Sequence, residues 1–158
     1  MNEIVDKRFE LEFKKLFKKL LNESVHLSFV EILDRVTSYL EIHCSDDLRK
    51  SLDTWYHCIS RQTFLENILL HHQVEEIVFY NKDYISFGEE SPIRIELDEE
   101  DYILSWTLLA FQNGVSWNHA HPFASFKATI ADKNLRITLT HPSCNPDNTM
   151  RAFVRTKM

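Results

Sequence analysis

The chain has 158 residues, of which 44% are hydrophobic and 27% charged, a composition typical of one globular domain or two small packed ones. Its glycines are Gly88 and Gly114, so it lacks the glycine-rich loop that cradles phosphate in P-loop and dinucleotide-binding proteins, and unaided ATP hydrolysis is excluded. The formal net charge of −6 argues against a general nucleic-acid binder, although residues 127–158 contain six basic residues and only two acidic ones.

The cysteines and the first residues of the chain bear on its compartment. Cys44, Cys58 and Cys144 are odd in number and contain no C-x-x-C pair, which favours a reducing environment. The N-terminus opens with charged residues rather than an apolar signal core, and no apolar run approaches the ~20 residues of a membrane-spanning helix. We therefore expect a cytoplasmic protein.

Residues 1–72 are predicted to form a small helical bundle, because apolar side chains recur there at helical spacing. The first apolar stripe consists of Phe9, Phe13, Leu16, Phe17, Leu20 and Leu21, with lysines on the opposite face. Ser28 with Glu31, and Thr63 with Glu66, match the capping box that marks a helix start. The lysine-rich helix would dock on an anionic membrane only if its phenylalanines pointed away from the bundle, and packing within the bundle explains the same pattern.

From residue 73 onward the pattern changes to short β runs separated by turns. Strands are predicted at 74–79, 84–87 and 93–97, with turns at 81–83 and 88–92. Asp98 is placed to cap a helix that ends at Gly114, where a left-handed residue is needed. Strands at 123–130 and 135–140, joined by 131–134, and a last strand at 150–155 follow. The sequence predicts an α+β protein: a helical bundle at 1–72 and a βββ-α-βββ antiparallel sheet domain at 73–158.

Four residues in two loops resemble metal ligands by type and clustering: His119, His121, His141 and Cys144. Zinc binds about four nitrogen or sulfur donors, and closely spaced pairs on loops can supply them, so a small zinc-dependent hydrolase is one hypothesis. Ordinary histidines on surface loops, with no supporting carboxylate nearby in the sequence, are the competing interpretation.

Arginines in the last third of the chain are candidates for anion binding. Arg136 and Arg155 lie within or at the ends of predicted strands, where a guanidinium is costly to bury without an anionic partner. Each could bind a phosphate or a carboxylate. An ordinary salt bridge or a solvated strand face is the alternative.

The order of three sequence stretches matches a known pattern. They are LENILLHHQVEEIVFYNKDYISF, HPFASFKATIADKNLRITLTHPSCNPDN and RAFVRTK. In this order they resemble the domain that precedes the motor core in type II/IV secretion and pilus-assembly ATPases, especially the CpaF-like ATPases of tight-adherence pili. Asp132-Lys133-Asn134 stands where that family usually has an Asp-Gly turn, and asparagine can adopt a positive φ at modest cost.

The resemblance implies a PAS-like fold for residues 73–158 and contacts with protein partners of a secretion or pilus-assembly system, including copies of the same chain. By motif position it implies that Arg136, Arg155 and, less directly, Arg151 approach nucleotide phosphates. The 158 residues contain no Walker A motif, so we expect a non-catalytic interaction or regulatory module without the motor domain, either a fragment of an ATPase or a stand-alone relative. We expect no cofactor, no nucleic-acid partner, and membrane association only through partners. A small-ligand-sensing domain is the other alternative, since PAS-like folds often enclose small molecules.

Overall fold

The chain divides into two compact units, Met1–Cys58 and Ile59–Met158. The computed structural model describes residues 2–23, 25–71, 75–86 and 93–156. Across these residues, no helix is both long and apolar enough to cross a bilayer. The division into domains at 1–72 and 73–158 stays a prediction, and the compact units separate at an earlier point of the chain.

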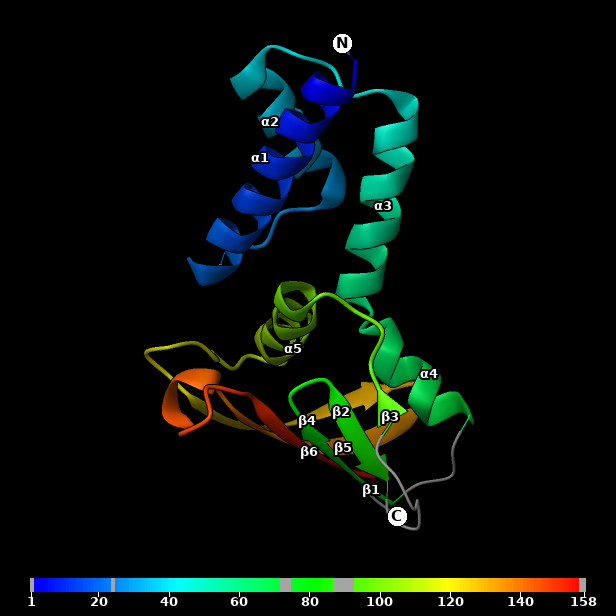
Figure 1. Cartoon of the computed structure of the whole chain (residues 1–158), viewed down its shortest axis with the longest axis vertical. Coiled ribbons are helices and arrows are strands. Elements are labelled where there is room, and N and C mark those ends of the chain that lie inside the picture. Colours follow the sequence, from blue (N-terminus) through cyan, green and yellow to red (C-terminus); the bar gives the residue numbers. More distant parts are fainter. Residues whose placement is uncertain (1, 24, 72–74, 87–92, 157–158) are drawn as a thin grey trace. The chain divides into compact units, whose positions relative to one another are not determined.

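The first unit is helical, as predicted (Figure 1). It consists of α1 (Asn2–Asn22), α2 (Phe29–Leu40) and most of α3 (Asp46–Ser60). The buried stripe of α1 is Phe9, Phe13, Phe17, Leu20 and Leu21. The rings of Phe13 and Phe17 pack edge-on against Trp55 of α3, at centroid distances of 6.3 and 5.5 Å. Because these phenylalanines are buried, α1 does not present the apolar face that membrane docking would need.

One of the two predicted capping boxes is present. Ser28 Oγ accepts the Glu31 N–H at 3.2 Å, and the Glu31 carboxylate accepts the Ser28 N–H at 3.3 Å, so the start of α2 is confirmed. The second box is wrong, because Thr63 is already the first residue of α4. Glu66 forms an ion pair with Arg61 at 3.2 Å.

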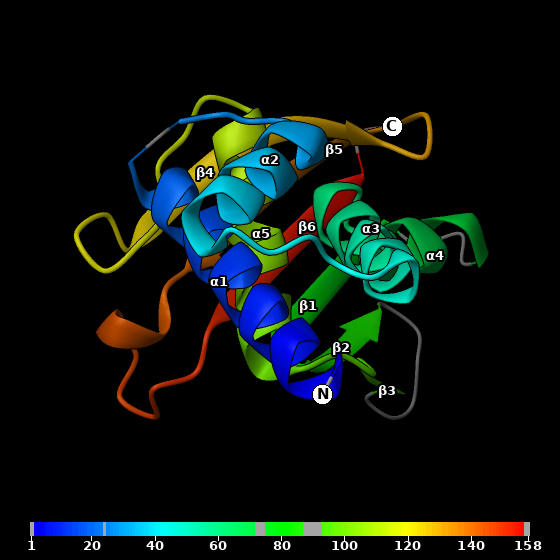
Figure 2. The same cartoon turned by 90° about the horizontal axis from the view of Figure 1, so that it is seen from above.

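The second unit is an antiparallel sheet with helices against one face. Its elements are α4 (Thr63–His71), β1 (Glu76–Tyr80), β2 (Asp83–Ser86), β3 (Ile93–Arg94), α5 (Glu99–Gln112), β4 (Phe123–Ile130), β5 (Lys133–Thr140), a 3₁₀ turn (Pro142–Cys144) and β6 (Arg151–Thr156). The strand order is β3-β2-β1-β6-β5-β4, and every neighbouring pair is antiparallel. The α+β class and the βββ-α-βββ order are confirmed. The last strand of the chain, β6, lies between β1 and β5 (Figure 2).

Helix α5 lies over one face of the sheet (Figure 1 and Figure 2). Its Tyr102 and Trp106 are fully buried, and Trp106 packs edge-on against Phe79 of β1 with ring centroids 5.2 Å apart. Helix α4 shares this core, since its Leu65 and Leu69 are buried in the same cluster. An apolar helix face does not reveal which core it joins, so the sequence pattern assigned α4 to the bundle.

Three local predictions near the turns need correction. The strand expected at 93–97 contains only Ile93 and Arg94. Asp98 is the N-cap of α5, but its side chain makes no capping hydrogen bond. The β4–β5 turn is formed by Ala131 and Asp132, at φ 52° and 61°, because a two-residue turn with two positive φ angles matches the twist of the flanking strands. Residues 133–134 already belong to β5, and the predicted turn at 88–92 lies outside the described residues.

Gly114 ends α5 as predicted. Its φ is +77°, and its N–H donates to the Phe111 carbonyl at 3.0 Å, while the Val115 N–H donates to the Ala110 carbonyl at 2.9 Å. These two bonds form a Schellman motif, which satisfies carbonyls that the helix end would leave open.

Candidate functional site

Three cations form a row across the sheet. Arg136 of β5 is directly opposite Lys127 of β4 on one side and Arg155 of β6 on the other. All three are exposed and alternate with buried residues in their strands, so they lie on the face that α5 does not cover. Neighbouring strands are about 4.8 Å apart, which places the three residues within about 10 Å. We call Lys127, Arg136 and Arg155 the basic row.

No side chain of the basic row is paired within the described part of the chain. None of its three side chains forms a hydrogen bond or ion pair with another described residue. Glu76 of β1 is opposite Arg155 and continues the row, but the two form no ion pair. Like charges directly opposite one another on neighbouring strands destabilise a sheet. A bound anion would remove this repulsion.

A cavity of about 580 Å³ lies at the basic row, within the size range of small-molecule sites. Its lining comes from β4, β5, β6, the residue after α5 and the residue before β1: Glu75, Asn113, Lys127, Ala128, Thr129, Asn134, Leu135, Arg136, Arg155 and Thr156. The row supplies charged donors, and the Asn134 side chain can supply an amide donor. The side-chain amide of Asn113 already donates to the Leu109 carbonyl at 2.8 Å, and Glu75 adds one carboxylate to the lining. This set of groups is suited to anionic oxygens such as those of phosphate or carboxylate.

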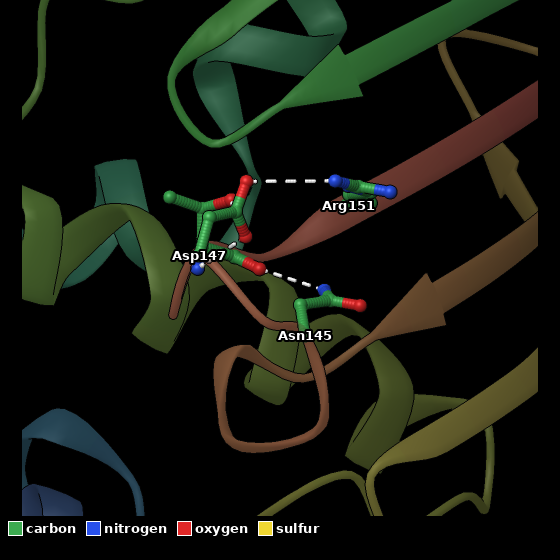
Figure 3. Close-up of polar contacts among 4 residues, drawn as sticks. Asn145, Asp147 and Arg151 are labelled. Atoms are coloured by element: carbon green, nitrogen blue, oxygen red, sulfur yellow. Dashed lines mark hydrogen bonds and ion pairs between the residues drawn. The ribbon is translucent and has the colours of Figure 1, made fainter.

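Arg151, the third phosphate candidate, lies apart from the basic row. It precedes Arg155 by four residues in β6, or about 13 Å along the strand. Its guanidinium bonds the Asp147 carboxylate at 3.4 Å (Figure 3) and lies over the Tyr80 ring, 5.4 Å from the centroid. Hydrogen bonds from Thr149, with a smaller contribution from Arg151, lower the pKa of the Asp147 carboxyl. Arg151 therefore already has an anionic partner.

The four metal-ligand candidates lie on the loops that flank the β4–β5 hairpin. His141 Nδ1 accepts the Ser143 N–H at 3.2 Å, and the Cys144 thiol donates to the His141 carbonyl at 3.1 Å. Burial, and to a lesser extent the nearby His119, lowers the pKa of His141. His119 and His121 are exposed. In the described segments, no three or more His, Cys, Asp or Glu residues are grouped to hold a metal ion, so the geometry lends no support to a zinc-dependent hydrolase.

Lys127 is the member of the basic row that the sequence prediction missed. Counting outward from a two-residue turn at 131–132 places Lys127 opposite Arg136, whereas the turn expected at 131–134 concealed this register. The position of Arg155 beside Arg136 depends on the pairing of β5 with β6 across the loop that joins them. No local signal reveals which strand β6 will join.

Comparison with known proteins gives a likeness in structure. No family model matches the chain, and no curated protein matches it. Among solved structures, the chain is similar to the VirB11 ATPase of the Brucella suis type IV secretion system in complex with sulphate, with a TM-score of 0.49, 16% sequence identity and coverage of 65% of this chain. The chain spans 31% of that protein, and the ATPase activity and the bound sulphate are properties of that protein.

Proposed function

We propose that this chain is a non-catalytic interaction module that binds the phosphate groups of a nucleotide through its basic row. The observation that carries the proposal is the alignment of Lys127, Arg136 and Arg155 on adjacent strands, at one cavity, where none of the three forms a hydrogen bond or ion pair with another described residue. A guanidinium binds two phosphate oxygens at once and keeps its charge at physiological pH. A phosphate chain between the cations would replace repulsion within the row with attraction.

The order of the three sequence stretches supports a relation to the domain that precedes the motor in CpaF-like secretion ATPases. In that setting the module acts in the cytoplasm through protein partners of a secretion or pilus-assembly system, and the nucleotide is one whose hydrolysis occurs on another domain or chain. The sequence contains no G-x-x-x-x-G-K-[ST] motif, which supports a role in sensing nucleotide rather than hydrolysing it.

The proposal is tested by titrating the isotope-labelled chain with MgATP and, separately, with inorganic pyrophosphate while its backbone amide resonances are recorded. We expect weak binding, with a Kd on the order of 1 mM, and the largest shifts at Lys127, Arg136 and Arg155. Equal affinity for the two ligands would identify a phosphate site without base recognition, and tighter binding of MgATP would identify a nucleotide site.

Variants of the row locate the binding. Arg136→Gln and Arg155→Gln should each weaken binding about fivefold or more, because each removes a charge-assisted contact. The matched control is Arg94→Gln, since Arg94 is another exposed strand arginine but is already paired with Asp83 at 3.4 Å; binding should not change. The phosphate site is refuted if neither ligand shifts the amide resonances of the row at ligand concentrations well above the expected Kd. Steady ATP turnover by homogeneous protein would contradict the non-catalytic role.

A further inference from the structure

Strand β4 is at one edge of the sheet that the described residues form. The His141 N–H donates to the Pro122 carbonyl at 2.7 Å. Because hydrogen-bonded and non-hydrogen-bonded residue pairs alternate along antiparallel strands, this bond determines which residues of β4 bond to β5. Residues 124, 126, 128 and 130 exchange hydrogen bonds with β5, and residues 123, 125, 127 and 129 direct their N–H and C=O groups outward. Within the described part of the chain, no hydrogen bond reaches these outward groups. The edge can therefore hydrogen-bond to another extended chain.

The residues with free backbone groups also carry the exposed side chains of β4: Phe123, Ser125, Lys127 and Thr129. Phe123 is 72% exposed. Strand β5 adds Asn134, Arg136, Thr138 and Thr140 on the same face. Neither strand places a carboxylate there, so a side chain that approaches Lys127 from beyond the edge meets one cation with a second directly behind it.

A lysine on an edge strand often serves only to prevent self-association. One charge is sufficient for that purpose. Here Arg136 and Arg155 place two more positive charges on the next two strands, and the repulsion between neighbouring cations destabilises the sheet. An acidic residue opposite Lys127 on an added strand would give the row a negative charge at its outer end, as Glu76 does at its inner end. The charge at this edge thus favours an acidic partner strand.

We propose that β4 binds an acidic, extended segment of a protein partner as an additional antiparallel strand, with Asp or Glu opposite Lys127 and an apolar residue opposite Phe123. Antiparallel pairing matches every existing pair in the sheet and is the more stable arrangement per residue. In that direction the apolar residue follows the acid by four positions, so the partner carries the pattern [DE]-x-x-x-apolar. Backbone hydrogen bonds supply affinity and alternate side chains supply specificity. The inference rests on the proposed function only in treating the chain as an interaction module.

The probe is an eight-residue peptide that pairs with residues 130 to 123, with glutamate at its fourth position, phenylalanine at its eighth and threonine elsewhere. Hydrogen exchange of the backbone amides is followed in the full chain. We expect the outward amides of Ser125, Lys127 and Thr129 to exchange rapidly without peptide and slowly with it. The amides of Phe126 and Ala128 bond to β5 and should be protected in both states, which makes them an internal control.

Modified peptides and a charge reversal test the mode of binding. N-methylation at the fourth and sixth positions removes two hydrogen bonds to β4 and should weaken binding about tenfold or more. The N–H groups at the third and fifth positions point away from β4, so N-methylation there should leave the affinity unchanged. Lysine at the fourth position should weaken binding about fivefold, and Lys127→Glu in the chain should restore it. The inference is overturned if the peptide does not protect the outward amides from exchange, or if both pairs of methylation sites have the same effect on the Kd. It is also overturned if Lys127→Glu does not restore the affinity for the lysine peptide. If the Lys127→Thr variant dimerises and the unchanged chain does not bind the peptide, Lys127 serves only to prevent self-association at the edge.

Failure of this inference can be separated from failure of the proposed function. Arg155→Gln should impair pyrophosphate binding and leave the peptide affinity within about twofold, because Arg155 is two strands away from the edge. Pyrophosphate binding without peptide binding refutes strand addition alone, and peptide binding without pyrophosphate binding refutes the phosphate site alone.

Discussion

Replacement of Arg136 with glutamine removes the central charge of the basic row, and we expect it to stabilise the protein. Arg136 faces Lys127 and Arg155 and has no anionic partner among the described residues. Two like unit charges about 5 Å apart in water repel by about 0.8 kcal/mol, and screening at 0.1 M salt reduces this to about 0.5 kcal/mol. With two neighbours, the expected gain in the free energy of unfolding is about 1 kcal/mol. Glutamine keeps much of the aliphatic stem, so the loss of packing is small.

The assay for this prediction is urea unfolding followed by circular dichroism at low and at high salt. At about 1 M salt the screening length is about 3 Å, shorter than the spacing between strands, so the stabilising effect of Arg136→Gln should largely disappear. Arg94→Gln is the control and should be neutral or slightly destabilising, because it removes the pair with Asp83. If Arg136→Gln destabilises the protein at low salt, or if its gain does not depend on salt, the row is not an uncompensated cluster and the reasoning fails.

Three further predictions follow from local geometry. Gly114→Ala should lower the free energy of unfolding by about 1 kcal/mol purely through its φ of +77°, since no atom of the described residues, apart from the two chain neighbours, lies within 4 Å of the added Cβ; Gly114→Asn should cost less in the same urea assay. The double change Ala131→Asn and Asp132→Gly should add about 1 kcal/mol, because it gives the β4–β5 turn residues that tolerate positive φ, and a loss of stability would contradict the turn. His141 has a pKa below its ordinary 6.5, chiefly through burial and secondarily through His119, so the unfolded chain binds this proton more readily. The stability contribution of His141 is then full above about pH 6.5 and decreases as the pH falls toward the lower folded-state pKa; His141→Asn should flatten that part of the pH profile of Tm.

The order of the elements in the second unit could be predicted because its signals are local. Turn residues at 81–82 and Gly114 at the end of α5 mark boundaries between elements. Each alternation of apolar and polar residues within a strand spans only a few residues. Such patterns specify which face of a strand is buried, and the same alternation places Lys127 and Arg136 on the exposed face.

The candidate site could be predicted only in part, because it depends on pairings between distant segments. Arg136 and Arg155 were selected one at a time by residue type and predicted strand position. Arg151 was added only through its motif position in the family resemblance, and it is bound to Asp147. The strand order alone decides that Arg155 joins the row and that β4 is left at an edge. Strand order reflects burial of the whole core, which no short stretch of sequence encodes.

The two proposals share Lys127, and this makes their combination testable. The acid of a partner strand and a phosphate at the row would both draw on the charge of Lys127, so each should weaken the binding of the other, by equal factors, as linkage requires. We expect saturating pyrophosphate to raise the Kd of the glutamate peptide about two- to fivefold, the range expected for one partly shared charge. A control peptide with glutamine at the fourth position should be unaffected, since it makes no use of that charge. If pyrophosphate weakens both peptides equally, the effect is general screening or a change in the strand itself, and Lys127 is not shared. Because backbone hydrogen bonds of β4 are the same for both peptides, the difference between them isolates the side-chain charge from strand pairing.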